Sequence, residues 1–551
     1  MAELKRRKVY RVAVAYVVVG TGIIGVADAA LPDDVWDRLQ MPIVVLILVG
    51  LPIALVLAWA YEIKPEEPRE EEPTTPAIIE TPQSEHKKSI VVLPFDNISP
   101  DPNDAYFSDG LTEEIITNLS YLHSLRVISR NSAMVLKGTQ KDTRTIAEEL
   151  DVQYVLEGSV RKAGEDLRIT AQLIDATRDE HLWAEKYEGR LEDIFDVQER
   201  IARSIVERLK LQLSPAEEKR VAARPIADPH AYDTWVLAMH EGRKFTQDGV
   251  DRAIHLANEA LAIVGDSALL HAALGYFHWG AYDFGISHDD DTLLQAEKYA
   301  SRALELDPNL PQALYSMGLV RYKRNDLQGF VRYAKRAVEL APDSDALGFL
   351  AFVLAEVGRI SEARPNAEEA LARDPLIFFS SFVLAAVDIF DGQFSKALNR
   401  LRDARERLAP GEPFAGWWLA QAAAYAGEED EARTVFEEVA AMKVGLWSDM
   451  SELFHIALEG DQNGVYNVLD NTNLREMATT DEYYPLFLAN ALSRVGDKDE
   501  ALRWLEQAIS WGFTNHRFLS QHNRFLEPLR VDQRFQALME TAQERERAFS
   551  A

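Results

Sequence analysis

Three acidic residues on one short segment are the first candidates for chemistry in this sequence. Asp109, Glu113 and Glu114 lie within seven residues that begin at Ser108. Carboxylates grouped in this way supply the oxygen ligands that Mg²⁺ and Ca²⁺ prefer. The same residue types also suit the start of a helix, where acidic groups interact favourably with free backbone N–H groups. The second interpretation is favoured, so the sequence predicts no metal site here.

The usual motifs for nucleotide, thiol and zinc chemistry are missing from the region around these acids. Residues 89–213 contain neither the GxxxxGKS/T loop that cradles phosphates nor the GxGxxG turn of dinucleotide folds. The chain has no cysteine, which excludes thiol catalysis and Cys-based zinc sites, and its 12 histidines show no HExxH spacing. The sequence therefore predicts a protein that is not an enzyme, with no catalytic residues, no cofactor and no metal.

Charge and length limit the classes of partner. The 551 residues include 89 acidic and 59 basic side chains, a formal net charge of −30. Such a field repels phosphates, so we expect no nucleic-acid partner. A chain of this length and 47% hydrophobic content is expected to form two or more folded domains.

Two apolar segments near the amino terminus have the length of transmembrane helices. Residues 12–31 contain one charged residue, Asp28, and residues 41–61 contain none. About twenty apolar residues suffice to cross a bilayer. The sequence thus predicts that residues 1–61 form a membrane anchor, a two-helix transmembrane hairpin, with the lipid bilayer as partner of residues 12–61.

The basic cluster at residues 5–11 predicts the orientation of this hairpin. Basic residues favour the cytoplasmic side, which would place the chain in a bacterial inner membrane with its remaining part in the cytoplasm. A secretory signal peptide at 12–31 is the alternative, and it would place that part in the periplasm. Residues 62–88, rich in Pro and Glu, are expected to form an extended tether.

Residues 89–213 have the pattern of a small α/β domain. The apolar run at 90–93 and the alternating segments 152–160 and 167–174 predict strands. Residues 143–150 and 195–213 instead carry apolar side chains at helical spacing. Strands that alternate with helices in this order are typical of a layered α/β fold.

Five segments of this domain resemble one family, the TolB-like (FlgO-related) amino-terminal domain. They are 93–99 (LPFDNIS), 106–115 (YFSDGLTEEI), 154–161 (YVLEGSVR), 168–176 (RITAQLIDA) and 181–185 (HLWAE). In bacterial proteins this module typically precedes tetratricopeptide repeats, and it is often fused to an adenylate cyclase or a winged-helix domain. The resemblance implies an assembly or sensing module, and it brings no catalytic residues with it.

A repeat of about 34 residues organises the chain beyond a predicted linker at 214–228. Prolines mark the period, because Pro308, Pro342, Pro375 and Pro410 lie 34, 33 and 35 residues apart. This is the period of the tetratricopeptide repeat, in which each unit is a helix–turn–helix. We therefore expect a tetratricopeptide-repeat superhelix with a carboxyl-terminal cap over residues 229–545.

The first helix of each repeat lines a concave groove, and the period predicts which residues face it. These positions are unusually aromatic, and aromatic side chains supply large contact areas in protein interfaces. Packing between neighbouring first helices explains any single one of them equally well. The predicted protein-binding residues are Tyr315, Tyr322, Phe352, Phe379, Phe382, Phe390, Trp417 and Tyr425.

These observations combine into one expected architecture and two functional hypotheses. The architecture is multidomain, with a two-helix transmembrane hairpin, a small α/β (TolB-like) domain and an all-α repeat solenoid. The first hypothesis is a non-enzymatic, membrane-anchored scaffold or adaptor whose groove binds a protein or peptide partner. The alternative is a ligand-sensing regulatory protein, related to cyclase-associated modules, whose TolB-like domain binds a small molecule or nucleotide. The oligomeric state stays open.

Overall fold

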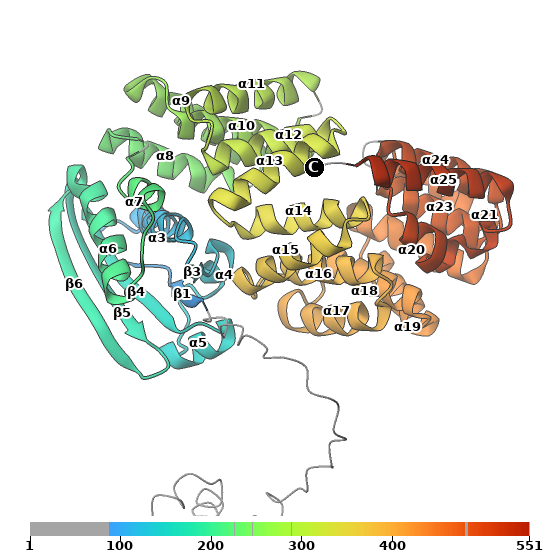
Figure 1. The fold of residues 1–551 in the computed structure, drawn as a ribbon, viewed down its shortest axis with the longest axis horizontal. Coiled ribbons are helices and arrows are strands. Elements are labelled where there is room, and N and C mark those ends of the chain that lie inside the picture. Colours follow the sequence, from blue (N-terminus) through green and yellow to red (C-terminus); the bar gives the residue numbers. More distant parts are fainter. Residues whose placement is uncertain (1–86, 225, 245, 288, 480–482, 550–551) are drawn as a thin grey trace, which may run out of the picture. The chain divides into compact units, whose positions relative to one another are not determined.

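The computed structural model describes residues 87–224, 226–244, 246–287, 289–479 and 483–549. They belong to one compact unit of the chain, residues 86–551. In this unit a mixed α/β domain is followed by a long array of helices (Figure 1). The segments 12–31 and 41–61, and most of the 62–88 tether, lie outside the described residues.

The predicted membrane placement is corrected by the structure. No helix in the described ranges is both long and apolar enough to cross a bilayer. The longest of them, α9 (Gln247–Val264), has 18 residues and buries only a narrow face rich in alanine. A fold class that includes a transmembrane hairpin is therefore not supported, nor is a location in a bacterial inner membrane on either side. The described fold is an α/β domain joined to an all-α array.

The α/β domain is built on a mixed sheet with the strand order β3-β1-β4-β5-β6. The amino-terminal strands pair in parallel, and the last three form consecutive antiparallel pairs. A short strand, β2, pairs in parallel with β4. The strands are β1 (Lys88–Val92), β2 (Asp96–Asn97), β3 (Leu125–Val127), β4 (Tyr154–Ala163), β5 (Asp166–Asp175) and β6 (Glu180–Arg190).

The helix α3 connects this sheet to the rest of the molecule. It contacts β1 and β3 on one side and the first array helix on the other. Its apolar residues Leu111, Ile115 and Leu119 are buried in the domain core. The helices of this domain are η2 (Pro102–Asp104), α3 (Ala105–Ser120), α4 (Arg130–Val135), α5 (Thr143–Leu150), η3 (Leu191–Asp193), α6 (Ile194–Arg208) and α7 (Pro215–Val221).

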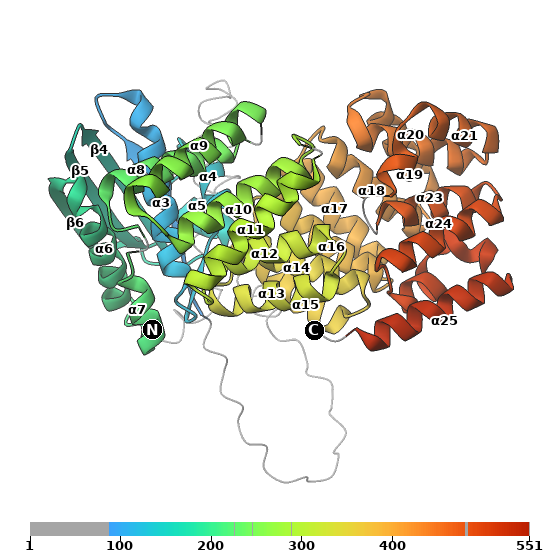
Figure 2. The same ribbon diagram turned by 90° about the horizontal axis from the view of Figure 1, so that it is seen from above.

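The array consists of helices that pair with their neighbours in chain order, from α8 with α9 to α23 with α24 (Figure 2). A final helix, α25 (Gln533–Ala548), packs on α24. The first helices of the units are α8 (Pro229–Gly242), α10 (Ala268–Asp283), α12 (Pro311–Lys323), α14 (Ser344–Glu356), α16 (Phe378–Phe390), α18 (Pro413–Ala426), α20 (Gly445–Glu459) and α23 (Tyr484–Arg494). Their partners are α9, α11 (Asp290–Leu306), α13 (Leu327–Leu340), α15 (Ile360–Arg373), α17 (Phe394–Leu408), α19 (Glu429–Ala441), α21 (Gln462–Asn471) and α24 (Lys498–Trp511).

The repeat signals in the sequence coincide with the ends of these helices. Helix α11 ends at Leu306, two residues before Pro308, and α13 ends at Leu340, two residues before Pro342. The turns inside the units contain residues with positive φ, including Gly358 at 82° and Gly427 at 90°. Glycine adopts this backbone conformation without steric cost. The prediction of a tetratricopeptide-type array is confirmed.

The last part of the chain folds back onto the array. After α22 (Leu474–Met477) and the α23/α24 pair, the chain forms η4 (Phe518–His522) and η5 (Arg524–Leu529). Backbone N–H groups of Thr514 and Asn515 donate to the carbonyl oxygen of Glu356, at 3.1 and 2.8 Å. These bonds attach the carboxyl-terminal segment to α14, more than 150 residues earlier in the chain.

Candidate ligand-binding cavity

A cavity of about 530 Å³ lies between the α/β domain and the first helices of the array. Helices α3 and α4 and the region around α7 form one wall. Helices α8, α10, α12 and α14, with the turn that precedes α14, form the other. This volume falls within the range of small-molecule sites in proteins.

Hydrogen bonds close the α/β domain onto the array at the turn after α15. The backbone N–H of Ser129 donates to the carbonyl oxygen of Arg373 at 2.7 Å. The N–H of Ser132 donates to Oδ1 of the buried Asp374 at 2.9 Å, and the N–H of Leu376 donates to Ser132 Oγ at 2.9 Å. The cavity is therefore bounded by fixed contacts rather than by loose loops.

A second set of contacts holds α8 against the α/β domain. Nζ of Lys162 donates to Asp233 on α8 and to the hydroxyl group of Tyr106, both at 2.9 Å. Glu113 on α3 forms ion pairs with Arg130 and with Arg243 at the end of α8. The pairs Lys162–Asp233 and Glu113–Arg243 join the α/β domain to α8, whereas Glu113–Arg130 lies within the α/β domain.

Burial changes the acid–base properties of the carboxylates in the cavity wall. Burial, together with the charge of Glu113, raises the pKa of Glu114 to about 8, against an opposing effect of Arg243. Asp343 and Asp345 have accessible side chains at the cavity, but the protein atoms around them withhold water from their carboxyl groups. This desolvation and the neighbouring charge of Asp343 raise the pKa of Asp345 to about 7, and desolvation also raises the pKa of Asp343. Ionising these groups is costly while the cavity holds no compensating charge.

Several aromatic side chains line the same cavity. Tyr232 lies near Trp235, with ring centroids 5.8 Å apart, and its hydroxyl group accepts a hydrogen bond from Gln198 at 2.6 Å. Burial and the charge of Asp345 raise the pKa of both Tyr276 and Tyr315, so both hydroxyl groups stay protonated. The wall thus combines ring surfaces with charged groups of both signs.

Two buried donors in this wall have no hydrogen-bond acceptor among the described residues. They are Nε1 of Trp235 and Nη1 of Arg373, and the two side chains are 5% and 2% exposed. A buried donor without an acceptor costs about 1–3 kcal/mol, which a ligand or water in the cavity can offset. This feature favours a binding site over a simple packing gap.

The predicted groove residues are mostly buried among other aromatic side chains. Tyr315 lines the cavity, and Tyr322 packs edge-on against Phe349 at 4.6 Å. Phe379 is partly buried and lies 5.7 Å from Phe382 between ring centroids. Four of the remaining residues, Phe382, Phe390, Trp417 and Tyr425, belong to one large core cluster, and the partly buried Phe352 packs against it.

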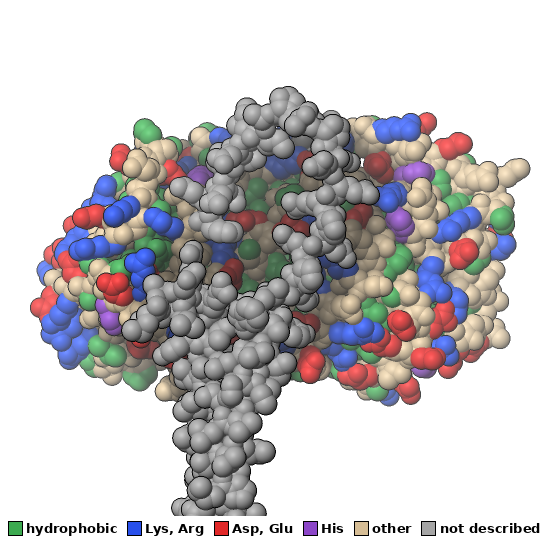
Figure 3. Space-filling view, turned by 60° about the horizontal axis from the view of Figure 1, so that its bottom comes forward, with side chains coloured by type: hydrophobic (Ala, Val, Ile, Leu, Met, Phe, Trp, Pro, Cys, Tyr) green, Lys and Arg blue, Asp and Glu red, His purple; other side chains and the backbone are tan. Residues whose placement is uncertain are grey.

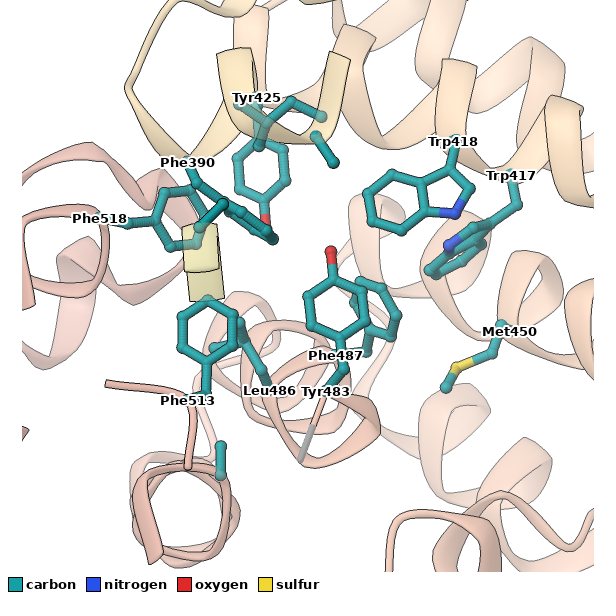
Figure 4. Packing of buried hydrophobic residues seen from close by; sticks show 14 of the residues in the cluster. Phe390, Trp417, Trp418, Tyr425, Met450, Tyr483, Leu486, Phe487, Phe513 and Phe518 are labelled. Atoms are coloured by element: carbon teal, nitrogen blue, oxygen red, sulfur yellow. The ribbon is translucent and has the colours of Figure 1, made fainter. Parts of the chain in front are cut away.

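The carboxyl-terminal part of the chain covers this core cluster. Figure 4 shows Tyr483, Phe513 and Phe518 pointing toward Phe390 and Tyr425. Ring centroids of Phe390 and Phe518 are 5.1 Å apart, so no layer of solvent separates them. As the structure stands, a partner cannot reach these rings, and their role in protein binding stays a prediction.

The acidic segment that suggested a metal site has another role in the structure. The helix begins at Ala105, so Asp109, Glu113 and Glu114 lie beyond its first residues and do not cap it. Asp109 accepts from Lys137 Nζ at 2.6 Å, and Glu113 is paired with Arg130. The structure shows no group of metal-ligating side chains among the residues that it describes.

Sequence reasoning missed the cavity itself. Its wall comes from segments between Glu113 and Arg373, and no local motif links them. The one available signal was the acidic and aromatic content of the segments that turned out to meet. On the outer face in Figure 3, by contrast, acidic and basic side chains are intermixed.

The comparisons with known proteins match different parts of the chain. The model of a family described as HilA/YgeH-like transcriptional regulator, second domain, matches residues 86–204, which form most of the α/β domain. This description differs from the TolB-like family that the sequence motifs resemble, and that resemblance stays a prediction.

Two curated relatives match over about half of the chain. Putative adenylate cyclase 3 of Rhizobium meliloti (strain 1021) is 42% identical over 254 residues, which are 46% of this chain and 43% of that protein. Transcriptional regulator HilA of Salmonella typhimurium is 22% identical over 294 residues, 52% of this chain and 51% of HilA. The chain therefore spans about half, or less, of the length of these relatives.

One solved structure with a similar arrangement is a Rap protein complexed with competence and sporulation factor. It is 15% identical, covers 58% of this chain and 99% of its own, and has a TM-score of 0.44. The array is therefore described from its own helices rather than from this likeness.

The prediction that the chain is not an enzyme is contradicted by these comparisons. The relative with 42% identity has an enzyme name, putative adenylate cyclase 3. Missing motifs within residues 89–213 were the basis of the prediction, and they say nothing about reactions that use other motifs.

Proposed function

We propose that this chain is a ligand-responsive interaction protein. A small molecule in the cavity would set how firmly the α/β domain is held against the helical array. The array would then present a surface to a protein or peptide partner that depends on the bound ligand. This proposal differs from the ligand-sensing alternative of the sequence analysis, in which the TolB-like domain alone binds the small molecule or nucleotide.

The single observation that supports this proposal is the composition of the cavity wall. A ligand in it contacts Glu114 and Asn131 of the α/β domain on one side and Ala272, Tyr315 and Asp345 of the array on the other. Ligand binding to a site shared by two parts stabilises the arrangement in which both parts contact it. Ligand binding in the cavity and partner binding by the array would therefore be coupled without any moving lid.

The names of the relatives are compatible with such a module. One is called a regulator and another a cyclase, and in both cases about half of the protein lies outside the match. A module that converts ligand binding into a change at a shared surface could serve either kind of protein. The partner of the present chain would be a protein or peptide, in keeping with the helical array.

The proposal is tested by a thermal-shift screen of small molecules on the full chain, with two matched variants. Ala272 is buried in the cavity wall on α10, whereas Ala441 is exposed at the end of α19. Ligands at one hundred times their Kd should stabilise the chain by about 2.7 kcal/mol. We expect Ala441→Trp to keep this response and Ala272→Trp, which fills the cavity, to lose it.

Two results would overturn the proposal. One is a screen in which no molecule raises the melting temperature. The other is a response that Ala272→Trp retains in full, because the ligand would then bind elsewhere. Cooperative unfolding of both variants without ligand is the control for folding.

A further inference from the structure

The acidic side chains of the cavity fall into two classes. Some are neutralised by the chain itself, since Glu113 is paired with Arg130 and Arg243, and Asp307 with Arg220 at 3.3 Å. Charges that are already compensated offer little to a ligand, because their attraction is satisfied within the protein.

The second class forms no direct ion pair among the described residues and consists of Glu114, Asp343 and Asp345. Asp345 accepts one long hydrogen bond, from Asn131 Nδ2 at 3.4 Å. Asp343 accepts only from backbone N–H groups, those of Asp345 and Ala346, at 3.0 and 3.1 Å. Carboxylates left unpaired in a cavity attract a cation, which also removes the cost of ionising them.

Two tyrosine rings line the cavity together with Asp343 and Asp345. They are Tyr276 and Tyr315, and burial, together with the charges of both acids, raises the pKa of each. An ammonium group is attracted to the face of an aromatic ring as well as to a carboxylate. The acidic end of the cavity therefore suits an organic ammonium group better than a bare metal ion.

One N–H group of a buried guanidinium in the same wall has no acceptor in the part of the chain that the structure describes, although the guanidinium itself forms an ion pair with Glu369. Arg373 donates from Nε to Glu369 at 2.8 Å, but its Nη1 has no acceptor among the described residues. Asp343 and Arg373 both line the cavity, and the residues that follow them are joined, because Ser344 Oγ donates to Asp374 Oδ2 at 3.4 Å. A guanidinium group with a free N–H binds carboxylates and phosphates well.

We propose that the cavity binds a small zwitterion, an amino acid or a short peptide, through Asp343, Asp345 and Arg373. Its ammonium group would contact the two carboxylates, and its anionic group would accept from Arg373 Nη1. The apolar body would lie against Leu269, Ala272 and Leu310, which line the remaining wall. This inference rests on the proposed function, because it names the ligand class for the same cavity.

The test uses calorimetric titration of the full chain with the free amino acids and a set of dipeptides. The tightest binder is then compared with two relatives of itself. One is the amine that lacks its carboxylate, and the other is the N-acetylated form that lacks its ammonium group. We expect the zwitterion to bind at least tenfold more tightly than either.

Variants identify the groups that hold the ligand. Asp345→Asn should weaken binding of the zwitterion and the amine about tenfold and leave the N-acetylated form unchanged, a tenfold change being about 1.4 kcal/mol. Arg373→Gln should weaken binding of the zwitterion and of the N-acetylated form and leave binding of the amine unchanged. The matched control is Asp307→Asn, which removes an acid of the same cavity whose charge is already paired.

The outcomes separate this inference from the proposed function. Equal binding of the zwitterion and its amine would overturn the zwitterion assignment, as would no binding of any amino acid or dipeptide while other molecules bind in the cavity. If no molecule of any class binds, the proposed function itself fails. Since the buried Arg373 can be required for folding, Asp345→Asn alone decides the ammonium contact.

Discussion

Lys162 on β4 donates a hydrogen bond from Nζ to Oδ2 of Asp233 on α8, at 2.9 Å. The same ammonium group donates to the hydroxyl group of Tyr106 on α3, which in turn donates to the other oxygen of Asp233 at 2.8 Å. Lys162 is 8% exposed, so this three-membered network is largely shielded from solvent. It joins the sheet, its central helix and the first helix of the array.

Replacing Lys162 by Met should destabilise the chain. The change leaves Asp233 without its cationic partner and the Tyr106 hydroxyl group without its donor, and removing one partner of a shielded ion pair costs about 1–4 kcal/mol. Urea denaturation should show the loss. The control is Lys186→Met on β6, where the lysine is half exposed and pairs with Glu188, and we expect a change within about 0.5 kcal/mol. Equal effects of the two variants would contradict the role of the network.

Gly110 tests how closely α3 approaches the array. A Cβ atom at this position would lie 2.2 Å from Cγ1 of Val236 on α8. Helix propensity alone predicts that Gly110→Ala stabilises by up to about 1 kcal/mol, whereas overpacking predicts a loss of about 1–3 kcal/mol. We expect the loss, measured as a lower melting temperature. Val236→Ala in the same chain should restore stability, and a failure to do so would place the strain elsewhere.

The carboxyl group of Glu114 should make the stability of the chain depend on pH. Its pKa is about 8 in the folded chain and about 4.3 when unfolded, so the folded state holds its proton more tightly. Stability from this group is present below pH 4 and is lost as the pH rises from 4 to 8. Between pH 5 and pH 8 the free energy of unfolding should fall less in Glu114→Gln than in the native chain, by about 1 kcal/mol or more, as measured by urea denaturation. The exposed Glu192→Gln serves as control, and an unchanged slope in Glu114→Gln would refute the assignment.

Phe518 should be essential for the cover of the aromatic core cluster. It is fully buried and lies 5.1 Å from Phe390 and 5.7 Å from Tyr425 between ring centroids. Phe518→Ala should cost about 3–5 kcal/mol and increase the fluorescence of a dye that binds exposed apolar surface. Val531→Ala is the matched control, because Val531 is 81% exposed. If the eight predicted groove residues bind a peptide, the Phe518 variant should bind it more tightly than the native chain.

The regular parts of the fold could be predicted because local residue types determine them. Proline cannot continue a helix, so Pro308 marks the end of α11, and the residues that alternate at 167–174 form β5. Predicted segment 143–150 coincides with α5, where Asp142 accepts from the N–H of Thr145 at 2.7 Å. The short helix α4 was not predicted, because six residues hold too little pattern to be recognised.

The site could not be predicted in the same way. The period indicates which face of a repeat helix a residue occupies, but it does not tell what covers that face. In this chain the α/β domain forms the other wall of the cavity that Tyr315 lines, and the segment around Phe513 covers Phe390. Glu114 was interpreted as a helix-start residue. Its place in the cavity wall could not be predicted, because the rest of that wall comes from α8, α10 and α12, which lie far from Glu114 in the sequence.

The contacts at the turn after α15 have a consequence for protein synthesis. Arg126 donates from Nη1 to the carbonyl oxygen of Ala372 at 2.6 Å, and 246 positions separate these residues. At about 5–20 residues per second, a ribosome needs on the order of 10–50 s to add that stretch. Within this interval the last strand of the sheet is completed at Arg190, and from then until Ala372 is added the α/β domain lacks the surface that closes its open side. A folding helper that binds nascent chains therefore has a defined window in which to act.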